Sequence, residues 1–373
     1  NRDSKNNQKQ TEKKKVTGTV RRRNRNIPRW DKLDNTAHLF PVIAGESMTN
    51  TYRIAVELTE EVDGATLQEA LNLVLPKFDL FNVRMRTGFF WYYFEENGKK
   101  APTVREEHTY PCRYIQENKN RGYMFRVSYY KKRINLEVFH VLTDGMGGIN
   151  FLKELTYQYL RLVHPKLREE VGDTLSTDTS LNREDSFLRN YRKSAKKGYQ
   201  SQRAFEIKGE RLDKEEFGVI HGYVKIPELK EVCHRYGMSI NEYLVATYVW
   251  SIYKECLHGM TSDRAIRAAV PVNLRPFFDS VTTKNFFAMV SAELVPDREN
   301  LTYEEVCERV KQSLRGQINK EHLEKLFSYN VSNQQNLFAS AVPLVLKNLA
   351  IRVVYTQSAL ANTTTITNIG NIR

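Results

Sequence analysis

A strand that runs directly into a glycine-rich turn and then a helix is the feature that most constrains this chain. Apolar side chains alternate along 134–138, which predicts a strand with one apolar face. His140 continues that face, and Asp144 follows at the turn, before glycines and a helical apolar pattern at 149–163. The sequence therefore places an imidazole and a carboxylate close together at the end of a strand.

These two side chains suit acid–base chemistry, although their spacing alone does not assign it. An imidazole in an apolar interior tends to stay neutral because desolvation penalises the charged form, and a neutral imidazole can accept a proton. The carboxylate of Asp144 could act as an acid or base, orient His140, cap the helix or bind a distant cation. The alternative for the pair is a core histidine with satisfied hydrogen bonds, next to a helix cap.

A second polar segment follows another strand far along the chain. Residues 265–270 read as a strand, and the turn Pro271-Val-Asn273-Leu-Arg275-Pro276 comes directly after them. Arginine is always charged and binds a carboxylate through two parallel hydrogen bonds, so a buried Asp and Arg could lock two parts of a chain together. A surface arginine in a proline-bounded turn is the alternative for Arg275.

The His-x-x-x-Asp-Gly segment and the Asn-Leu-Arg-Pro turn together resemble the chloramphenicol acetyltransferase-like superfamily of coenzyme A-dependent acyltransferases. Within it, the chain is most similar to bacterial alcohol O-acetyltransferase-like proteins and more distantly to the condensation domains of nonribosomal peptide synthetases. The segments 30–35, 52–78 and 363–370 also fit, so the resemblance extends from about residue 28 to the end.

The resemblance implies an α/β fold of two chloramphenicol acetyltransferase-like subdomains, each a mixed sheet with packed helices, with an active-site tunnel between them. We expect a basic disordered tail at 1–27, an N-terminal subdomain at 28–165, a crossover linker at 166–216 and a C-terminal subdomain at 217–373. The chain begins without Met and ends soon after the 368–370 turn, which favours a fragment that lacks late donor-site residues.

At matching positions the resemblance implies roles for individual residues. His140 would be the general base that takes a proton from the acceptor as it attacks a thioester carbonyl. Asp144 would hold the motif through an ion pair with Arg275, and Gly145 would leave room for the acyl donor. Three further residues are candidates for substrate binding: Asn273, Asn368 and Trp91.

Two departures from the relatives affect the expected chemistry. Condensation domains usually carry two adjacent histidines, but Phe139 precedes His140 here, which favours simple acyl transfer over peptide-bond formation on carrier proteins. The Asp-Phe-Gly-Trp-Gly motif of related plant acyltransferases is also missing.

The net charge of +13 raises the question of nucleic-acid binding, but its location argues against it. Residues 1–26 hold ten Lys and Arg against two acids, so +8 of the charge lies in the tail. Such a tail is typical of a solvated, disordered extension, with peripheral contact to an anionic membrane surface or a nucleic acid as the alternatives. The mild remaining excess suits a phosphate-bearing donor such as coenzyme A.

No other class of site is indicated. The sequence contains no P-loop, zinc-protease or nucleophile-elbow motif, and neither a signal peptide nor an apolar membrane span. The cysteines show no spacing typical of a zinc site or a disulfide framework, which favours a reducing cytoplasm: Cys112, Cys233, Cys256 and Cys307.

Periodicity predicts further strands and helices along both halves. The predicted strands are 52–58, 81–86, 89–94, 123–130, 134–142, 219–226, 265–271 and 287–295. The predicted helices are 65–76, 149–163, 227–235, 239–257, 302–319 and 341–356, with Ser239 and Glu242 as a capping box. The aromatic run 89–94 suits a strand packed in the core, with substrate lining by Trp91 as the alternative.

The leading hypothesis is therefore an acyltransferase that moves an acyl group, expected to be acetyl, from acetyl-CoA or another acyl-CoA to a small alcohol or amine. Acyl-CoA would be a co-substrate, with no bound cofactor or metal. The alternative is a catalytically idle member of the same fold that binds an acyl thioester, a lipid or a partner protein. Carrier-linked condensation is a more distant third hypothesis.

Overall fold

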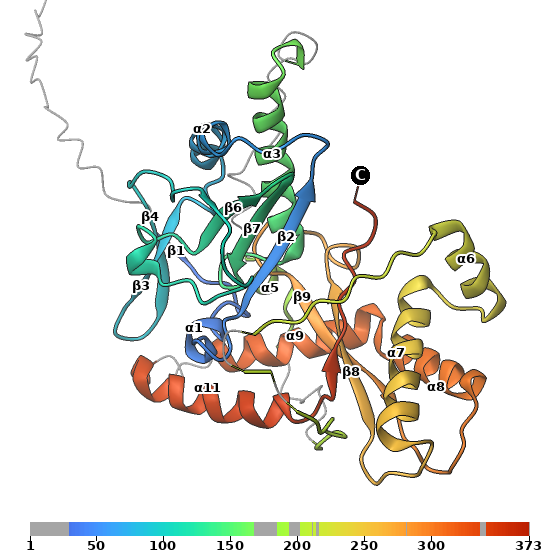
Figure 1. Cartoon of the computed structure of the whole chain (residues 1–373). Coiled ribbons are helices and arrows are strands. Elements are labelled where there is room, and N and C mark those ends of the chain that lie inside the picture. The colour runs from blue at the N-terminus through green and yellow to red at the C-terminus, as the bar shows by residue number, and fades with distance from the viewer. Residues whose placement is uncertain are drawn as a thin grey trace, which may run out of the picture.

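The computed structural model describes residues 30–167, 185–193, 202–210, 212–213, 216–280, 282–335 and 341–372. Figure 1 shows two α/β halves side by side, the first in blue to green and the second in yellow to red. The expected tail at 1–27 and most of the linker at 166–216 lie outside the described residues. The subdomain boundaries themselves stay a prediction.

The first half is built on a mixed sheet in the order β2-β7-β6-β5. Its strands are β2 (Thr51–Glu57), β7 (Arg133–Phe139), β6 (Phe125–Tyr130) and β5 (Arg105–Glu106), and only the β5–β6 pair is parallel. Two helices that pack against each other cover the sheet, α2 (Gly64–Val74) and α3 (Gly145–Val163). Asp63 caps α2 and Asp144 caps α3, each by accepting hydrogen bonds from backbone N–H groups of the first turn.

A small antiparallel sheet with the order β1-β4-β3 flanks this half. It contains β1 (Trp30–Lys32), β4 (Tyr92–Glu96) and β3 (Val83–Thr87). The short helix α1 (Phe40–Ile43) lies between β1 and β2, and the 3₁₀ turn η1 (Leu75–Lys77) lies between α2 and β3. A second 3₁₀ turn, η2 (Glu117–Lys119), lies between β5 and β6 of the main sheet.

The second half is built on the sheet β10-β8-β9. Strands β8 (Ile266–Asn273) and β9 (Phe287–Leu294) are antiparallel, and β10 (Thr364–Thr365) pairs with β8 in parallel. The helices of this half are α5 (Ser186–Asn190), α6 (Ile226–Arg235), α7 (Ile240–Leu257), α8 (Tyr303–Gln317), α9 (Lys320–Gln335) and α11 (Leu344–Ala359). The predicted capping box of α7 is confirmed, because Ser239 and Glu242 each accept a hydrogen bond from the other's backbone N–H.

Each half has its own hydrophobic core. One core gathers buried side chains between Leu33 and Tyr159, and the other gathers them between Phe187 and Val331. The predicted α/β class, with two halves that are each a mixed sheet with packed helices, is therefore confirmed.

The predicted strand 219–226 is wrong, the predicted strand 89–94 is right only for its last residues, and the helices α1 and α9 were not predicted. Residues 216–225 form no strand and are exposed, because they have no neighbouring strand to pair with among the described residues. In the aromatic run, Phe89 to Trp91 form the turn of the β3–β4 hairpin, which the hydrogen bond from Gly88 N to Trp91 O closes. Phe89 is 72% exposed there, so the expected core role holds only for the end of the run. Helix α9 was not predicted, because its polar residues mask the apolar spacing.

Within the described ranges, no helix is long and apolar enough to cross a membrane.

Candidate active site

His140 lies just beyond the end of β7, in a cage of aromatic rings. Its backbone N–H donates to Asn50 O at 2.9 Å, which extends the β2–β7 pairing by one residue. The ring stacks on Phe40 at a centroid distance of 4.6 Å and meets the edge of Tyr52 at 5.1 Å. Phe287, from the second half, lies 5.8 Å away. Burial among these rings lowers the pKa of the His140 imidazole below its ordinary 6.5, so the neutral form prevails at pH 7.

Asn285 determines which nitrogen of the neutral ring carries the proton. The Asn285 amide nitrogen lies 3.1 Å from Asp34 Oδ2 and 3.1 Å from the His140 carbonyl oxygen, so both of its hydrogens are donated. The amide oxygen, which can only accept, lies 3.0 Å from His140 Nδ1. The network therefore assigns the proton to Nδ1 and leaves the lone pair on Nε2.

A buried carboxylate holds Asn285 in this orientation. Asp34 is 1% exposed and accepts hydrogen bonds from Ala37 N at 2.8 Å and from Asn285 N at 3.3 Å, besides the Asn285 amide. Burial raises the pKa of its carboxyl to about 7. Asp34, Asn285 and His140 thus form one hydrogen-bonded chain. Asn285 comes from the second half and lies between Asp34 and His140, which both belong to the first half.

Asp144 is engaged on both of its oxygens, and none of its bonds reaches the His140 ring. Oδ1 accepts from Met146 N at 3.2 Å and Gly147 N at 3.3 Å, which caps α3. Oδ2 lies 2.8 Å from Arg275 NH1 and 3.2 Å from Phe286 N. Of the four roles left open for this carboxylate, the geometry supports two: it caps a helix, and it joins the two halves.

All three guanidinium nitrogens of Arg275 donate hydrogen bonds at this contact between the two halves. Besides the bond to Asp144, its Nε donates to Thr282 O at 2.9 Å and its NH2 donates to Lys284 O at 2.8 Å. Asn273 accepts from Arg275 N and NH1, both at 3.1 Å, so it positions the arginine and is itself exposed at the surface. A planar fork with donors in fixed directions suits this arrangement, whereas a single ammonium group could satisfy only part of it.

Gly145 differs from the two glycines that follow it. A Cβ at Gly147 would overlap the Thr143 hydroxyl and come within 2.7 Å of Thr283 O, and a Cβ at Gly148 would lie 2.7 Å from the Tyr52 hydroxyl. Those two positions require glycine for packing. A Cβ at Gly145 would touch only the Ile369 side chain, at an ordinary 3.5 Å, so nothing in the fold itself excludes a side chain there.

Two of the candidate substrate-binding residues lie apart from this cluster. Asn368 is exposed and accepts from Gly370 N at 2.8 Å within its own turn, although its neighbour Ile369 approaches Gly145. Trp91 lies at the tip of the β3–β4 hairpin, with Lys347 Nζ at 3.5 Å from its ring centroid. The contacts of these side chains do not include His140.

Sequence reasoning missed Asn285 and Asp34. Asp34 lies in the 30–35 segment that carried part of the resemblance, and Asn285 directly precedes the apolar strand β9. A polar residue next to a buried strand was the available signal, but its partner stands far away in the sequence. Only the folded chain brings the two residues together.

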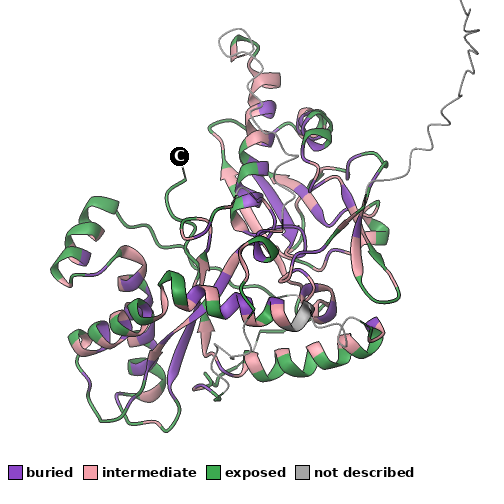
Figure 2. Cartoon of the chain, turned by 180° about the vertical axis from the view of Figure 1, so that it is seen from behind, coloured by how far each residue is buried: buried purple, intermediate pink, exposed green. Residues whose placement is uncertain are grey.

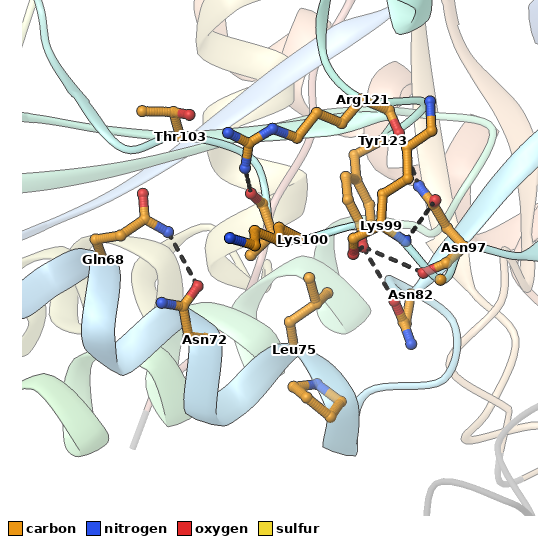
Figure 3. A pocket seen from close by; sticks show the side chains of 13 residues that line it. Gln68, Asn72, Leu75, Asn82, Asn97, Lys99, Lys100, Thr103, Arg121 and Tyr123 are labelled. Carbon is orange, nitrogen blue, oxygen red and sulfur yellow. Dashed lines mark hydrogen bonds between the residues drawn. The ribbon is translucent and has the colours of Figure 1, made fainter.

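The cavity in Figure 3 is a separate feature of the first half. It has a volume of about 670 Å³ and lies between α2 and the 97–103 segment, with Lys99, Lys100 and Arg121 on its wall. Its lining does not include His140, so this cavity is not the expected tunnel, which stays a prediction. Within the described residues, no group of three or more His, Cys, Asp or Glu is placed to hold a metal ion.

No protein-family model matches the sequence, and no curated protein matches it. Solved structures do match. TRI101 of F. graminearum, complexed with coenzyme A and deoxynivalenol, aligns with a TM-score of 0.60 at 12% identity, over 92% of this chain and 85% of that one. Polyketide synthase associated protein 5 of Mycobacterium tuberculosis aligns with a TM-score of 0.55 at 13% identity, over 79% and 75%. The condensation domain of the monacolin K polyketide synthase MokA aligns with a TM-score of 0.51 at 11% identity, over 82% and 76%. The chain therefore has the fold of TRI101, of polyketide synthase associated protein 5 and of the MokA condensation domain.

Proposed function

We propose that this chain is an acyltransferase that moves an acyl group, expected to be acetyl, from a coenzyme A thioester to an alcohol or amine. His140 is the general base of the proposed reaction. The observation that supports this most strongly is the bond between His140 Nδ1 and Asn285 Oδ1, because it leaves an unprotonated Nε2 on a neutral ring. A base in this state can take a proton at pH 7 without first losing one.

The proposed chemistry needs no covalent intermediate with the protein. His140 Nε2 removes the proton from the acceptor hydroxyl or amine as its oxygen or nitrogen attacks the thioester carbonyl carbon. The tetrahedral intermediate collapses, the carbon–sulfur bond breaks, and the departing thiolate takes the proton back from the imidazolium. The products are the ester or amide and free coenzyme A thiol, and the imidazole returns to its starting state.

Asp144 and Arg275 are positioning residues in this proposal. Asp144 Oδ2 binds both Arg275 and the backbone N–H of Phe286, next to Asn285. These bonds fix the turn after His140 to the loop that carries Asn285. Gly145 suits passage of the acyl donor beside it, since a Cβ there would meet only the Ile369 side chain, at an ordinary 3.5 Å. The buried Phe139 occupies the place of the first histidine of condensation domains, which favours a free acyl-CoA over a carrier-bound donor.

Acceptor-dependent turnover of acyl-CoA tests the proposal. The full chain is incubated with acetyl-CoA and longer acyl-CoAs against a panel of alcohols and amines, and the acylated product is detected by mass. Mass detection is chosen because a thiol reagent for the released coenzyme A would also react with free cysteines of the protein, which has four. His140→Ala should lose about 10² to 10⁴ in rate while the protein still folds. His164→Ala, at a half-buried histidine that caps the C-terminus of α3, is the control and should retain full activity.

Two results would contradict the proposal. Full activity of His140→Ala would remove the base from the mechanism. Measurable binding of acyl-CoA without turnover of any acceptor would instead support the catalytically idle alternative.

A further inference from the structure

The cavity in Figure 3, between α2 and the 97–103 segment, is lined by charges of one sign. Lys99 and Lys100 belong to that segment, and Arg121 precedes β6. Among the described residues, the lining contains no Asp, Glu or His, so three cations border one space of about 670 Å³. A concave site of this kind attracts ligands of opposite charge, and its volume suits a small molecule. We call it the α2 cavity.

The cations of the α2 cavity are not neutralised by carboxylates. No Asp or Glu in the described part of the chain forms a salt bridge with any of the three. A second cavity, of about 620 Å³, adjoins the first and shares Arg121 with it. There the buried charges are compensated, because Arg53 and Arg126 both bind Glu137 and Arg53 also binds Glu107. Of the two cavities, only the α2 cavity therefore has an uncompensated positive lining.

Hydrogen bonds fix the walls of the α2 cavity. Asn97, which is 1% exposed, donates from its amide to Arg121 O at 3.1 Å. The fully buried Tyr123 donates from its hydroxyl to Lys99 O at 2.8 Å. These bonds hold the backbone that carries the cations in one arrangement. A site that is already ordered loses less conformational entropy when a ligand binds.

Polar hydrogens around the cavity are available to a ligand. Asn72 lies on the exposed side of α2, which Figure 2 shows in green next to the buried purple side. Its Oδ1 accepts from Gln68 at 3.2 Å, and its Nδ2 donates to no described residue. Arg121 lies across the cavity in Figure 3 and uses only NH1, toward Ala101 O, so its Nε and NH2 can donate to a ligand. Donors on a charged group form the stronger hydrogen bonds with anions.

We propose that the α2 cavity binds a phosphorylated small molecule, with the phosphate group held by its three cations. A phosphate monoester presents three acceptor oxygens and about two negative charges, whereas a carboxylate presents two oxygens and one charge. Leu75 and the Tyr123 ring add buried apolar surface to the lining, which suits the organic part of such a ligand. The proposal does not depend on the chemistry at His140, because no residue of that site lines the cavity.

Calorimetric titration of the full chain with three phenyl compounds tests the proposal. Phenyl phosphate, benzoate and benzyl alcohol share one ring and carry about two, one and no negative charges at pH 7. Phenyl phosphate should bind most tightly and benzyl alcohol least tightly. The double variant Lys99→Gln with Lys100→Gln should weaken the binding of phenyl phosphate by about tenfold or more, because two charged donors are lost.

A second double variant controls for net charge. Lys131→Gln with Lys132→Gln removes the same number of charges from the exposed turn between β6 and β7, outside the cavity lining. It should bind phenyl phosphate like the parent. Thr103→Glu adds a carboxylate at an exposed position of the cavity wall and should also weaken binding. All of these variants should melt like the parent, because every substituted side chain is exposed.

Four outcomes would overturn the proposal. The parent fails to bind phenyl phosphate at millimolar concentration, or it binds phenyl phosphate no more tightly than Lys99→Gln with Lys100→Gln does. The control variant, Lys131→Gln with Lys132→Gln, loses as much affinity, which would assign the binding to diffuse charge. Benzoate binds the parent as tightly as phenyl phosphate, which would show that the cavity does not recognise a phosphate group.

Discussion

Asn285 holds the imidazole of His140 from 145 residues away in the sequence, through a 3.0 Å contact between Oδ1 and Nδ1. The orienting group is therefore a neutral amide and not the carboxylate of the adjacent motif. A neutral acceptor stabilises imidazolium less than a carboxylate does, and this agrees with a pKa of His140 that burial lowers. Asp144 in turn stabilises the joint between the halves. Orienting the imidazole and joining the two halves are therefore done by two different residues, Asn285 and Asp144.

Removing the Asn285 side chain should impair catalysis by freeing the ring. Asn285→Ala leaves Nδ1–H without its acceptor, so the tautomer with a protonated Nε2 becomes accessible and cannot act as a base. We expect kcat to fall by about tenfold to a hundredfold. The acid limb of the profile of kcat/KM against pH should also move to lower pH, because the Asn285 bond raises the pKa of His140.

A matched control separates this effect from lost stability. Asn97 is equally buried at 1% exposure, and its amide donates to Arg121 O at 3.1 Å, far from the proposed site. Asn97→Ala should lower the melting temperature while kcat and the pH profile stay at parental values. If Asn285→Ala showed the same behaviour as Asn97→Ala, Asn285 would be a structural residue only.

Breaking the Asp144–Arg275 pair should reduce stability and activity together. Arg275→Ala leaves Asp144 Oδ2 with a single partner and removes the donors to Thr282 O and Lys284 O, so we expect a cost of about 3 kcal/mol in unfolding free energy. Arg275→Lys should recover only part of this, because an ammonium group cannot reach all three acceptors. Thermal and denaturant unfolding measure both effects.

The control for the pair is an ion pair at the surface. Arg309 contacts Asp297 at 2.7 Å, with side chains 33% and 58% exposed, and Arg309→Ala should cost less than about 1 kcal/mol. Parental stability and turnover in Arg275→Ala would show that the contact does not join the halves.

Alanine substitutions at Gly147 and Gly145 should distinguish a glycine needed for packing from a glycine that leaves room for a ligand. Gly147→Ala should lower stability by about 1 to 3 kcal/mol, since its Cβ would overlap the Thr143 hydroxyl. Gly145→Ala should fold normally, because its Cβ would meet only Ile369 at an ordinary 3.5 Å, but should raise KM for acyl-CoA by about tenfold, because the donor is proposed to pass beside this position. Unchanged kinetics in a folded Gly145→Ala protein would place the donor elsewhere.

The local elements of this site were predictable from sequence, because they follow from periodicity and capping. The strand before His140, the helix after Asp144 and the turn that holds Arg275 all have short-range signals, namely alternating apolar residues, a capping carboxylate and flanking prolines. The resemblance to a known family then suggested that Asp144 and Arg275 meet.

What could not be predicted depends on contacts between distant segments. The packing of the two halves places Asn285, just before β9, beside His140, just after β7, and no local pattern encodes that neighbour. The aromatic hairpin tip was misjudged for a related reason. A run of bulky side chains favours a buried strand on propensity alone, but the hydrogen bond that closes the turn at Trp91 directs Phe89 outward.

Asp34 should make the stability of the protein depend on pH in an unusual direction. Burial raises the pKa of this carboxyl from 3.8 to about 7 in the folded state. Between these two values the unfolded chain has released a proton that the folded chain keeps, so the stability contribution of Asp34 is complete below pH 4 and is lost as pH rises toward 7. A shift of this size corresponds to about 4 kcal/mol.

Other groups also titrate between pH 4 and 7. The test is therefore the difference between the parent and Asp34→Asn in how the melting temperature changes with pH. Glu117, whose pKa burial also raises to about 7, contributes in the same sense, whereas His140 contributes in the opposite sense because its pKa is lowered. Asp34→Asn should therefore flatten the decline of melting temperature between pH 4 and 7, whatever its absolute cost. Glu117→Gln should flatten the decline as well.

Activity distinguishes the two carboxyls. Asp34 anchors the amide that orients His140, so Asp34→Asn should also lower kcat, because an amide at this position presents one acceptor oxygen where three N–H groups now donate. Glu117 has no contact with that chain, and Glu117→Gln should turn over normally. If the stability of Asp34→Asn changed with pH as steeply as that of the parent, the Asp34 carboxyl would be ionised in the folded state throughout pH 4 to 7. The ionised carboxylate of Asp34 would then orient Asn285 throughout this pH range.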